Sequence, residues 1–460
     1  MSTLTIAIIC VFVLGYATIA TESFMKIDKA AIALLMFVFC WTLYMFDPAP
    51  FVQLMHPDEF THVAENIPEF VNKVIIEHLG DTSTTLFFLM GAMTIVEIVD
   101  QNGGFNWVKD VMKTKSKRGL MWRIAFMTFI LSAILDNLTT SIVMIMILRK
   151  LVSSREDRLI YAGLIIISAN SGGAFSPIGD VTTIMLWNAG MITAAGVISE
   201  ILIPSLVSML IPAFILQYHL KGDLEESVNV ADNGESSEDF NATQRKIIFA
   251  VGVGGLMFVP IFKSITHLPP FVGIMLVLGM LWTVTEVFYR QLHKVKGGSE
   301  SFAKRVTSLL SRIDMATILF FLGILMAVAC LQEIGVLMQL GSSLNVVFDG
   351  NHYAVTGIIG VLSSIVDNVP LVAGSMGMYP VQPGTDMAVD GIFWQLLAYC
   401  AGVGGSMLII GSAAGVVVMG LEKISFGWYM KKITWIAFTG YIAGIACYYV
   451  IRTFIFTTPL

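Results

Sequence analysis

Two short segments of the chain carry the same acid–amide pair. Asp136-Asn137 and Asp367-Asn368 each follow a serine-containing stretch of apolar residues. Ionisable side chains within apolar segments are costly to bury, and they default to a functional role when polar residues flank them. Carboxylate and carbonyl oxygens are the ligands that hard cations prefer. The pairs therefore predict a sodium site formed by Asp136, Asn137, Asp367 and Asn368.

Two further apolar segments, 159–188 and 391–421, are interrupted by glycines and polar side chains. Carbonyls freed at such helix breaks can bind a cation beside side-chain oxygens. The first break carries Asp180 where the second carries Ser412, so the two half-sites are chemically unequal. The candidate residues for ion binding or proton coupling are Asp136, Asn137, Thr139, Thr140, Asn170, Asp180, Thr182, Thr183, Ser363, Ser364, Asp367, Asn368, Ser406 and Ser412.

Glu97, near the end of the apolar run 82–99, has two interpretations that stay open. It could relay protons to the site, or its carboxylate could reach the membrane interface. A carboxylate in the site itself can bind either a proton or a sodium ion, so the two ions compete for one group. Alternating access around such a shared site gives coupled exchange.

The acid–amide pairs belong to an internal repeat, which is typical of transporters. Three landmarks recur in the same order at nearly one offset, which common apolar letters produce rarely by chance. The landmarks are Leu86–Leu89 with Leu319–Leu322, Ser132–Asn137 with Ser363–Asn368, and the glycines 172, 173 and 179 with 404, 405 and 411.

The composition requires that these motifs lie in a membrane. Of the 460 residues, 56% are hydrophobic and 13% are charged, against about 25% charged in soluble domains. Five dispersed cysteines and seven dispersed histidines exclude a disulfide framework or a zinc site. Apolar runs of membrane-spanning length recur at 3–20, 29–46, 82–99, 198–218, 270–288, 315–332 and 433–451.

Segment 119–149 is too long for one membrane span of about 20 residues, and Asp136-Asn137 divides it near the middle. Basic clusters flank both ends, which predicts that both lie in the cytoplasm. We therefore expect a re-entrant hairpin here and a second one at 352–380. This topology places all lysines and arginines except Lys73, Lys263 and Arg452 on the cytoplasmic side.

The predicted fold class is an all-α polytopic membrane protein with inverted repeats, each containing a re-entrant hairpin and a broken transmembrane helix. The predicted units are an N-terminal scaffold segment (1–81), the first repeat (82–220), an acidic cytoplasmic linker (221–244) and a membrane segment (245–460) that includes the second repeat at about 315–456.

The motifs in combination resemble the NhaD family of sodium/proton antiporters, within the ion transporter superfamily, over nearly the whole chain. They are Gly15-Tyr16, Lys29–Leu34, Ser132–Asn137, Asn170–Gly173, Asp180–Thr183 and Ser363–Asn368. The resemblance implies export of sodium or lithium in exchange for protons, without a cofactor. It also implies ion-site roles for Asp136, Asn137, Asn170, Asp180, Thr182, Thr183, Asp367 and Asn368.

The resemblance further implies a homodimer in which a transport domain moves against a scaffold. We expect a multi-pass protein of a bacterial-type inner (plasma) membrane, with sodium ions, protons and lipid as partners and no nucleic acid. Two other functions are weighed. An anion carrier of the same superfamily would take dicarboxylates or arsenite, but the aspartates at both hairpin tips would repel an anion. An intramembrane aspartyl protease using Gly179-Asp180 would not explain the repeat.

Overall fold

The computed structural model describes residues 2–20, 27–63, 66–224, 240–296, 309–311, 313–365 and 367–455, and over these ranges the chain is helical without a β-strand. Residues outside these ranges include most of the predicted acidic linker (225–239), residues 297–308, Arg312, Val366 of the second repeat motif and residues 456–460. Seven described helices are long and apolar enough to cross a membrane, or eight if the bent pair Lys29–Tyr44 and Ala49–Met55 is one span. The prediction of an all-α polytopic membrane protein is confirmed.

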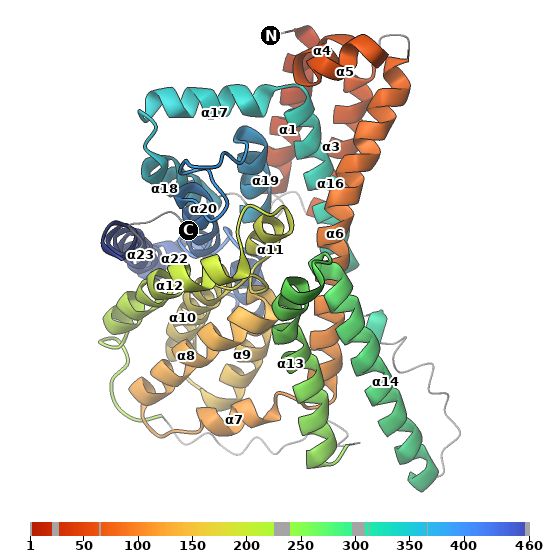
Figure 1. Cartoon of the computed structure of the whole chain (residues 1–460). Helices are drawn as coiled ribbons and strands as arrows, with labels where there is room; N and C mark the ends of the chain where they lie inside the picture. The colour runs from red at the N-terminus through yellow and green to blue at the C-terminus, as the bar shows by residue number, and fades with distance from the viewer. Residues whose placement is uncertain are drawn as a thin grey trace.

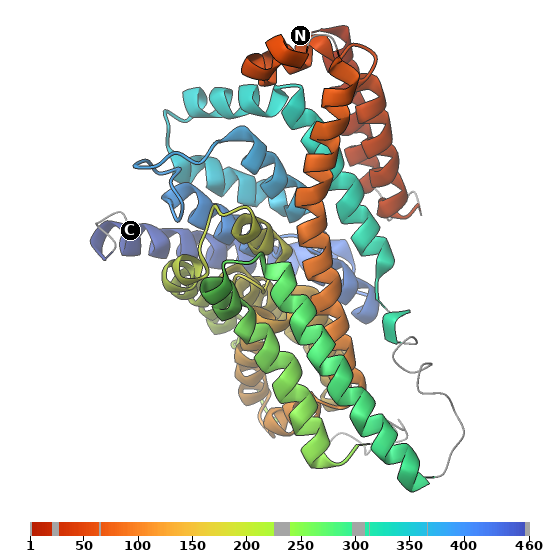
Figure 2. The same ribbon diagram turned by 45° about the vertical axis from the view of Figure 1, so that its right-hand side comes forward.

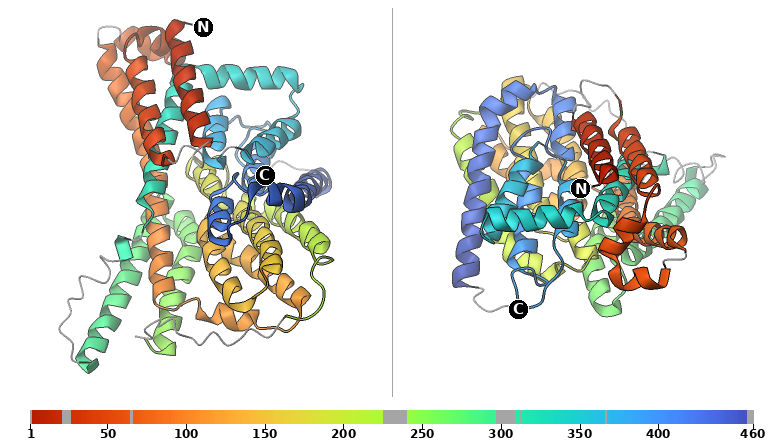
Figure 3. Two further views of the ribbon diagram at one scale, coloured as in Figure 1. Left: turned by 180° about the vertical axis from the view of Figure 1, so that it is seen from behind. Right: turned by 90° about the horizontal axis from the view of Figure 1, so that it is seen from above.

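The helices form two groups that lie side by side (Figure 1). The long-helix group consists of α1 (Thr3–Ala20), α3 (Lys29–Tyr44), α6 (Ile67–Gln101), α13 (Ala242–Thr266), α14 (Pro270–Lys296) and α16 (Met315–Glu333). The compact group consists of α8 (Lys117–Leu135), α9 (Asn137–Leu151), α10 (Arg155–Ala174), α11 (Val181–Asn188), α12 (Ala194–Leu216), α18 (His352–Ser363), α19 (Asn368–Met378), α20 (Ile392–Gly404), α21 (Ala413–Glu422), α22 (Phe426–Tyr429) and α23 (Trp435–Phe454), with the π-turn η1 (Met430–Thr434) before α23. Figure 3 shows the same division from behind.

Short helices connect or cover the two groups. Helices α4 (Ala49–Met55) and α5 (Pro57–Val63) cover one end of the long-helix group, while α7 (Asn106–Met112) and α17 (Val336–Val347) lead from α6 to α8 and from α16 to α18. In Figure 1, α7 and α17 lie at opposite ends of the compact group. The predicted span 82–99 is only the second part of α6, which begins 15 residues earlier, and α17 was not predicted.

The long-helix group pairs helices from the two halves of the chain. Helix α3 packs along α16, and α14 packs along α6. Within each half the first pair also packs together, α1 on α3 and α13 on α14. Figure 2 shows α6 and α16 running side by side through this group, with the two pairs at opposite ends. In each half, the second helix of the first pair (α3 or α14) therefore packs against a helix of the other half (α16 or α6, respectively).

Helices α8 and α9 form a hairpin with its tip at the predicted position, and its re-entrant placement in the membrane stays a prediction. The backbone reverses at Asp136, which has a positive φ of 85°. The open ends are held together, because Lys117 at the start of α8 forms an ion pair with Asp157 (Nζ to Oδ2, 2.7 Å) just beyond α9. Tyr161 also donates its hydroxyl proton to the Lys117 carbonyl at 2.8 Å. We call this element hairpin one.

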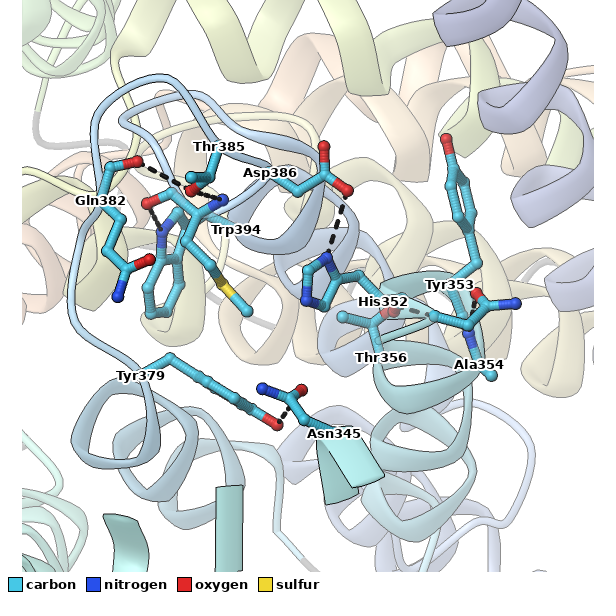
Figure 4. Close-up of polar contacts among 12 residues, drawn as sticks. Asn345, His352, Tyr353, Ala354, Thr356, Tyr379, Gln382, Thr385, Asp386 and Trp394 are labelled. Atoms are coloured by element: carbon cyan, nitrogen blue, oxygen red, sulfur yellow. Dashed lines mark hydrogen bonds and ion pairs between the residues drawn. The ribbon is translucent and has the colours of Figure 1, made fainter. Parts of the chain in front are cut away.

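Helices α18 and α19 form hairpin two within the predicted segment 352–380, and its re-entrant placement also stays a prediction. His352 at its start and Tyr379 at its end both pack against the ring of Phe393, with centroid separations of 5.8 and 4.8 Å. His352 also lies 3.2 Å from an Asp386 carboxylate oxygen, and Tyr379 contacts Asn345 of α17 (Figure 4). Hairpin two therefore opens toward α17, while hairpin one opens toward α7.

The contacts inside the two halves repeat. Ser132 donates to the carbonyl of Ala169 at 2.5 Å, and Ser363 donates to the carbonyl of Ala401 at 2.8 Å. Gly404 faces the carbonyl of Gly360 so closely that a Cβ would overlap it, and Gly172 faces the Phe129 carbonyl in the same way. These contacts seat each hairpin against the broken helix of its own half. The inverted orientation of the two halves across a bilayer stays a prediction.

Candidate functional site

The four helices that begin at the polar motifs of the two repeats, α9, α11, α19 and α21, each start at a capping side chain. Asp136 caps α9, Asp180 caps α11, Asp367 caps α19 and Ser412 caps α21, each accepting a hydrogen bond from a backbone N–H of the first turn. The N-terminus of a helix carries a partial positive charge and unpaired N–H groups, so an aspartate is the favoured partner there. Three carboxylates thus neutralise three of the four helix N-termini.

The N-termini of α9 and α21 are joined through one asparagine of α10. Asn137 at the start of α9 donates its side-chain amide to Asn170 Oδ1 of α10 at 3.1 Å. Asn170 in turn donates to Ser412 Oγ, the cap of α21, at 3.0 Å. All three side chains are buried, with Asn170 fully so. Hairpin one is thereby linked to the helix break of the other half of the chain.

The N-termini of α19 and α11 are joined directly by a hydrogen bond between side chains. Asn368 at the start of α19 donates its amide to both oxygens of Asp180, at 3.2 and 3.5 Å. The position that corresponds to Asn170 in the second half is Gly402, and a Cβ there would lie 3.2 Å from Asp180 Oδ2. The absent side chain leaves Asp180 the space that Asn170 fills in the other half. The predicted inequality of the half-sites therefore involves two positions, Asn170 with Gly402 and Asp180 with Ser412.

The aspartates differ in what surrounds them. Asp180 is 1% exposed. The two carboxylate oxygens of Asp136 accept hydrogen bonds from Thr139, one from its backbone N–H at 2.8 Å and the other from its hydroxyl at 2.9 Å. In the part of the chain that the structure describes, neither aspartate forms an ion pair with a lysine or arginine. Asp367 does: its Oδ2 lies 3.4 Å from Lys29 Nζ at the start of α3. Two of the three acids therefore lack a compensating side-chain cation.

Three predicted hydroxyls are buried near these caps without a described hydrogen-bond partner, those of Thr140, Thr182 and Thr183. A buried hydroxyl oxygen without a partner is costly, and a bound cation or water would satisfy it. These threonines lie in the first turns of α9 and α11, beside Asp136 and Asp180. Their oxygens suit an ion held between the two caps.

Other predicted residues have structural bonds. Ser363, Ser364 and Ser406 donate their hydroxyl protons to backbone carbonyls at 2.5 to 2.8 Å. In Ser364 and Ser406 the carbonyl belongs to the third residue back, which is a common local contact. Glu97 is half-buried on α6, in the long-helix group and near the carboxyl end of that helix.

A cleft of about 410 Å³ lies between α6, α11, α16 and α19. Its walls include Met185 of α11, five residues beyond the cap Asp180, and Ala373 of α19, six residues beyond the cap Asp367. These separations are about 7.5 and 9 Å along the helix axes. Other apolar residues and seven polar side chains also line it, the polar ones being His78, Asp81, Thr82, Thr84, Thr85, Asn188 and Gln332. The cleft approaches the Asn368–Asp180 pair from the side on which hairpin two opens.

Two features of this region were not predicted as parts of the site. The charge count placed Lys29 with the cytoplasmic lysines, whereas the structure brings its ammonium group to the tip of hairpin two. The only sequence signal was its membership of the motif Lys29–Leu34, quoted for the family resemblance. The cleft had no signal, because its residues come from four separated helices. No group of three or more metal-ligating side chains occurs among the described residues.

Comparison with known proteins agrees with this architecture. Residues 3–396 match the model of a family described as citrate transporter (CitMHS). The chain is 42% identical over 459 residues to sodium/proton antiporter 1 of Arabidopsis thaliana, covering 99% of this chain and 74% of that protein. It is 39% identical to sodium/proton antiporter 2 of Arabidopsis thaliana (96% and 99% covered) and 30% identical to Na+/H+ antiporter NhaD of Alkalimonas amylolytica (95% and 89% covered). The chain therefore belongs to the CitMHS family of membrane carriers and, within it, to the NhaD group of sodium/proton antiporters.

Proposed function

We propose that the chain is a secondary active antiporter that exports sodium or lithium in exchange for protons by alternating access. The observation that carries the proposal is the pair of cross-links Asn137–Asn170–Ser412 and Asn368–Asp180. They gather several neutral oxygens and two acids, Asp136 and Asp180, that have no compensating cation among the described lysines and arginines. Such a group can hold a small cation or a proton.

The capping pattern favours a cation over an anion. Bare helix N-termini form an anion site, because their N–H groups and dipoles attract negative charge. Here Asp136, Asp180 and Asp367 occupy three of those N-termini with carboxylates of the chain itself. An anionic substrate would meet these charges, whereas a sodium ion is attracted by them.

The same carboxylates provide the exchange. We infer that the carboxylates of Asp136, Asp180 and Asp367 bind sodium when ionised and release it when protonated. Oxygens of Thr140, Thr182 and Thr183 complete the coordination. The capped helix ends are held in fixed relative positions by the hydrogen bonds of Asn137, Asn170, Asn368 and Ser412. The cleft beside α11 and α19 serves as the route from the side on which hairpin two opens.

Reconstitution into liposomes with a pH-sensitive dye inside tests this proposal. Sodium and lithium should each drive proton movement, potassium should not, and Asp180→Asn should abolish the signal because it removes the ionisable group while keeping its shape. Asp136→Asn and Asp367→Asn should also be severe, and more so than Thr139→Ala. Robust sodium-driven exchange by Asp180→Asn at wild-type protein levels would refute the assignment of Asp180.

A second function is favoured by one observation, the family description as citrate transporter. On this alternative, a di- or tricarboxylate would bind between the hairpin tips with sodium or protons as the driving ion. The same liposomes decide between the two: citrate or succinate uptake with no sodium-driven proton signal would replace the antiporter by an anion carrier. Because the family consists of carriers, an intramembrane protease is not supported, and the chain is not an enzyme.

The assembly and location are also inferred. The chain is an integral multi-pass membrane protein, and we propose a bacterial-type inner (plasma) membrane, as its bacterial relatives support. We further propose a homodimer through α13 and α14, whose most apolar windows are only 28% buried within one chain. Cysteine cross-linking at Ile261, exposed on α13, should then yield a dimer. Cross-linking that leaves only monomers would contradict this interface.

A further inference from the structure

Lys29 contacts both a carboxylate and an aromatic ring at the tip of hairpin two. Its ammonium nitrogen lies 3.4 Å from Asp367 Oδ2 and 4.3 Å from the centre of the Phe320 ring. The two partners are partly shielded, with 27% of the lysine side chain and 18% of the aspartate side chain exposed. An ion pair at this depth is screened less than one at the surface.

The pair connects the two groups of helices. Lys29 begins α3 and Phe320 lies on α16, both in the long-helix group, while Asp367 caps α19 in the compact group. Asp367 is also within electrostatic range of Tyr16 of α1 and of Asp180. Asp367 therefore lies between a cation of the long-helix group and an acid of its own group.

We propose that Lys29 is a tethered counter-ion that occupies the cation position at Asp367 and is displaced when sodium binds there. This inference rests on the proposed function. An ammonium group and a sodium ion carry the same charge, and two cations in contact with one carboxylate would repel each other. Occupation by sodium thus releases the link between α3 and hairpin two, and departure of sodium restores it.

The chain contains a matched control for this lysine. Lys263 on α13 is also half-buried and lies 4.6 Å from the centre of an aromatic ring, that of Trp187. Its ammonium group donates to the Trp187 backbone carbonyl at 3.0 Å, whereas that of Lys29 faces a carboxylate. A carbonyl at that position does not depend on sodium, so Lys263 should keep its contacts in all conditions.

Amine labelling of the purified wild-type protein tests the displacement directly. Acylation with a small reagent, quantified by mass spectrometry, should increase at Lys29 when choline is replaced by sodium, with the same half-saturation as transport. Labelling of Lys263 should not change. Labelling of Lys29 that ignores sodium, in a protein that does exchange sodium for protons, would overturn the proposal while leaving the function intact.

Sodium affinity gives a second, independent measurement. Lys29→Met removes the competitor and should tighten sodium binding roughly threefold to tenfold, while Lys29→Arg should retain wild-type affinity more closely. A merely structural lysine would leave the affinity unchanged or weaken it, and the control Lys263→Met should leave it unchanged. Unchanged affinity in Lys29→Met overturns the inference alone. Absence of sodium binding and exchange in the wild type overturns both the inference and the proposed function.

Discussion

Replacing Asn170 by alanine isolates the link between hairpin one and the opposite helix break. The change removes the acceptor for the Asn137 amide and the donor to Ser412. It does not introduce charge, and alanine is a good helix former at this position near the carboxyl end of α10. We therefore expect an intact fold whose ion site has lost one fixed contact.

The magnitude follows from what each partner has left. Ser412 Oγ still accepts from the N–H of Gly415 at 3.2 Å, so it keeps a partner. The Asn137 amide, 6% exposed, loses its acceptor, and an unsatisfied buried polar group costs about 1–3 kcal/mol. If this cost falls on the ion-bound state, sodium binding weakens by a factor of about 5 to 150.

The assay is the sodium dependence of proton movement in liposomes, compared with Asn102→Ala. Asn102 is also a buried asparagine with two hydrogen bonds, to the Ile98 carbonyl and from the Tyr289 hydroxyl, both at 2.6 Å. It ends α6 in the long-helix group, away from the helix caps. Both variants should melt at lower temperature, but only Asn170→Ala should raise the sodium concentration at half-maximal rate.

Two results would refute this reasoning. One is a half-saturating sodium concentration in Asn170→Ala within twofold of wild type. The other is additivity of Asn170→Ala and Ser412→Ala, because two groups in one hydrogen-bond network should be coupled. Equal effects of Asn170→Ala and Asn102→Ala on sodium dependence would mean that the effect arises from lost stability.

Three other predictions concern the frame around the site. Glu422→Gln should destabilise the protein by about 1–3 kcal/mol, because the buried Glu422 carboxylate accepts hydrogen bonds from Arg149 and Arg158 at 2.7 and 3.2 Å. An unchanged melting temperature would contradict a stabilising role of these two ion pairs. Gly404→Ala should lower the melting temperature because its Cβ would meet the Gly360 carbonyl, whereas Gly420→Ala, with open space around it, should be neutral or stabilising; equal melting temperatures would remove the argument from close packing. Finally, labelling of single cysteines should find both ends of hairpin one in the cytoplasm and both ends of hairpin two outside, and labelling of the two ends of hairpin one from opposite faces would reject its re-entrant topology. The positions are 115, 154, 349 and 386.

Much of this architecture was predictable from the sequence because it depends on local properties. Continuous apolar runs predict membrane helices, since burial of the backbone in lipid requires helical hydrogen bonding. The polar pairs Asp136-Asn137 and Asp367-Asn368 predict the hairpin tips, because an aspartate beside an amide favours a helix cap over a helix interior. The nearly constant offset of the repeat predicts a hairpin and a helix break in each half of the chain.

The contacts between halves depend on the tertiary structure. That Asn137 reaches Ser412 through Asn170, and that Asn368 meets Asp180, follows from the crossing of α10 and α20, which no spacing in the sequence encodes. The length of α6 and the existence of α17 were also missed, because their amphipathic or mixed segments lack a continuous apolar run.

The sequence by itself determined the membrane class, the two hairpins, the two helix breaks and the acids placed at them, because each results from residues adjacent in the chain. Only the tertiary structure decided which acid has a counter-ion. Lys29 is 338 positions from Asp367, and it reaches that carboxylate because α3 packs along α16 of the other half. Ion pairing acts over a few ångströms in space, and sequence separation carries no information about that distance.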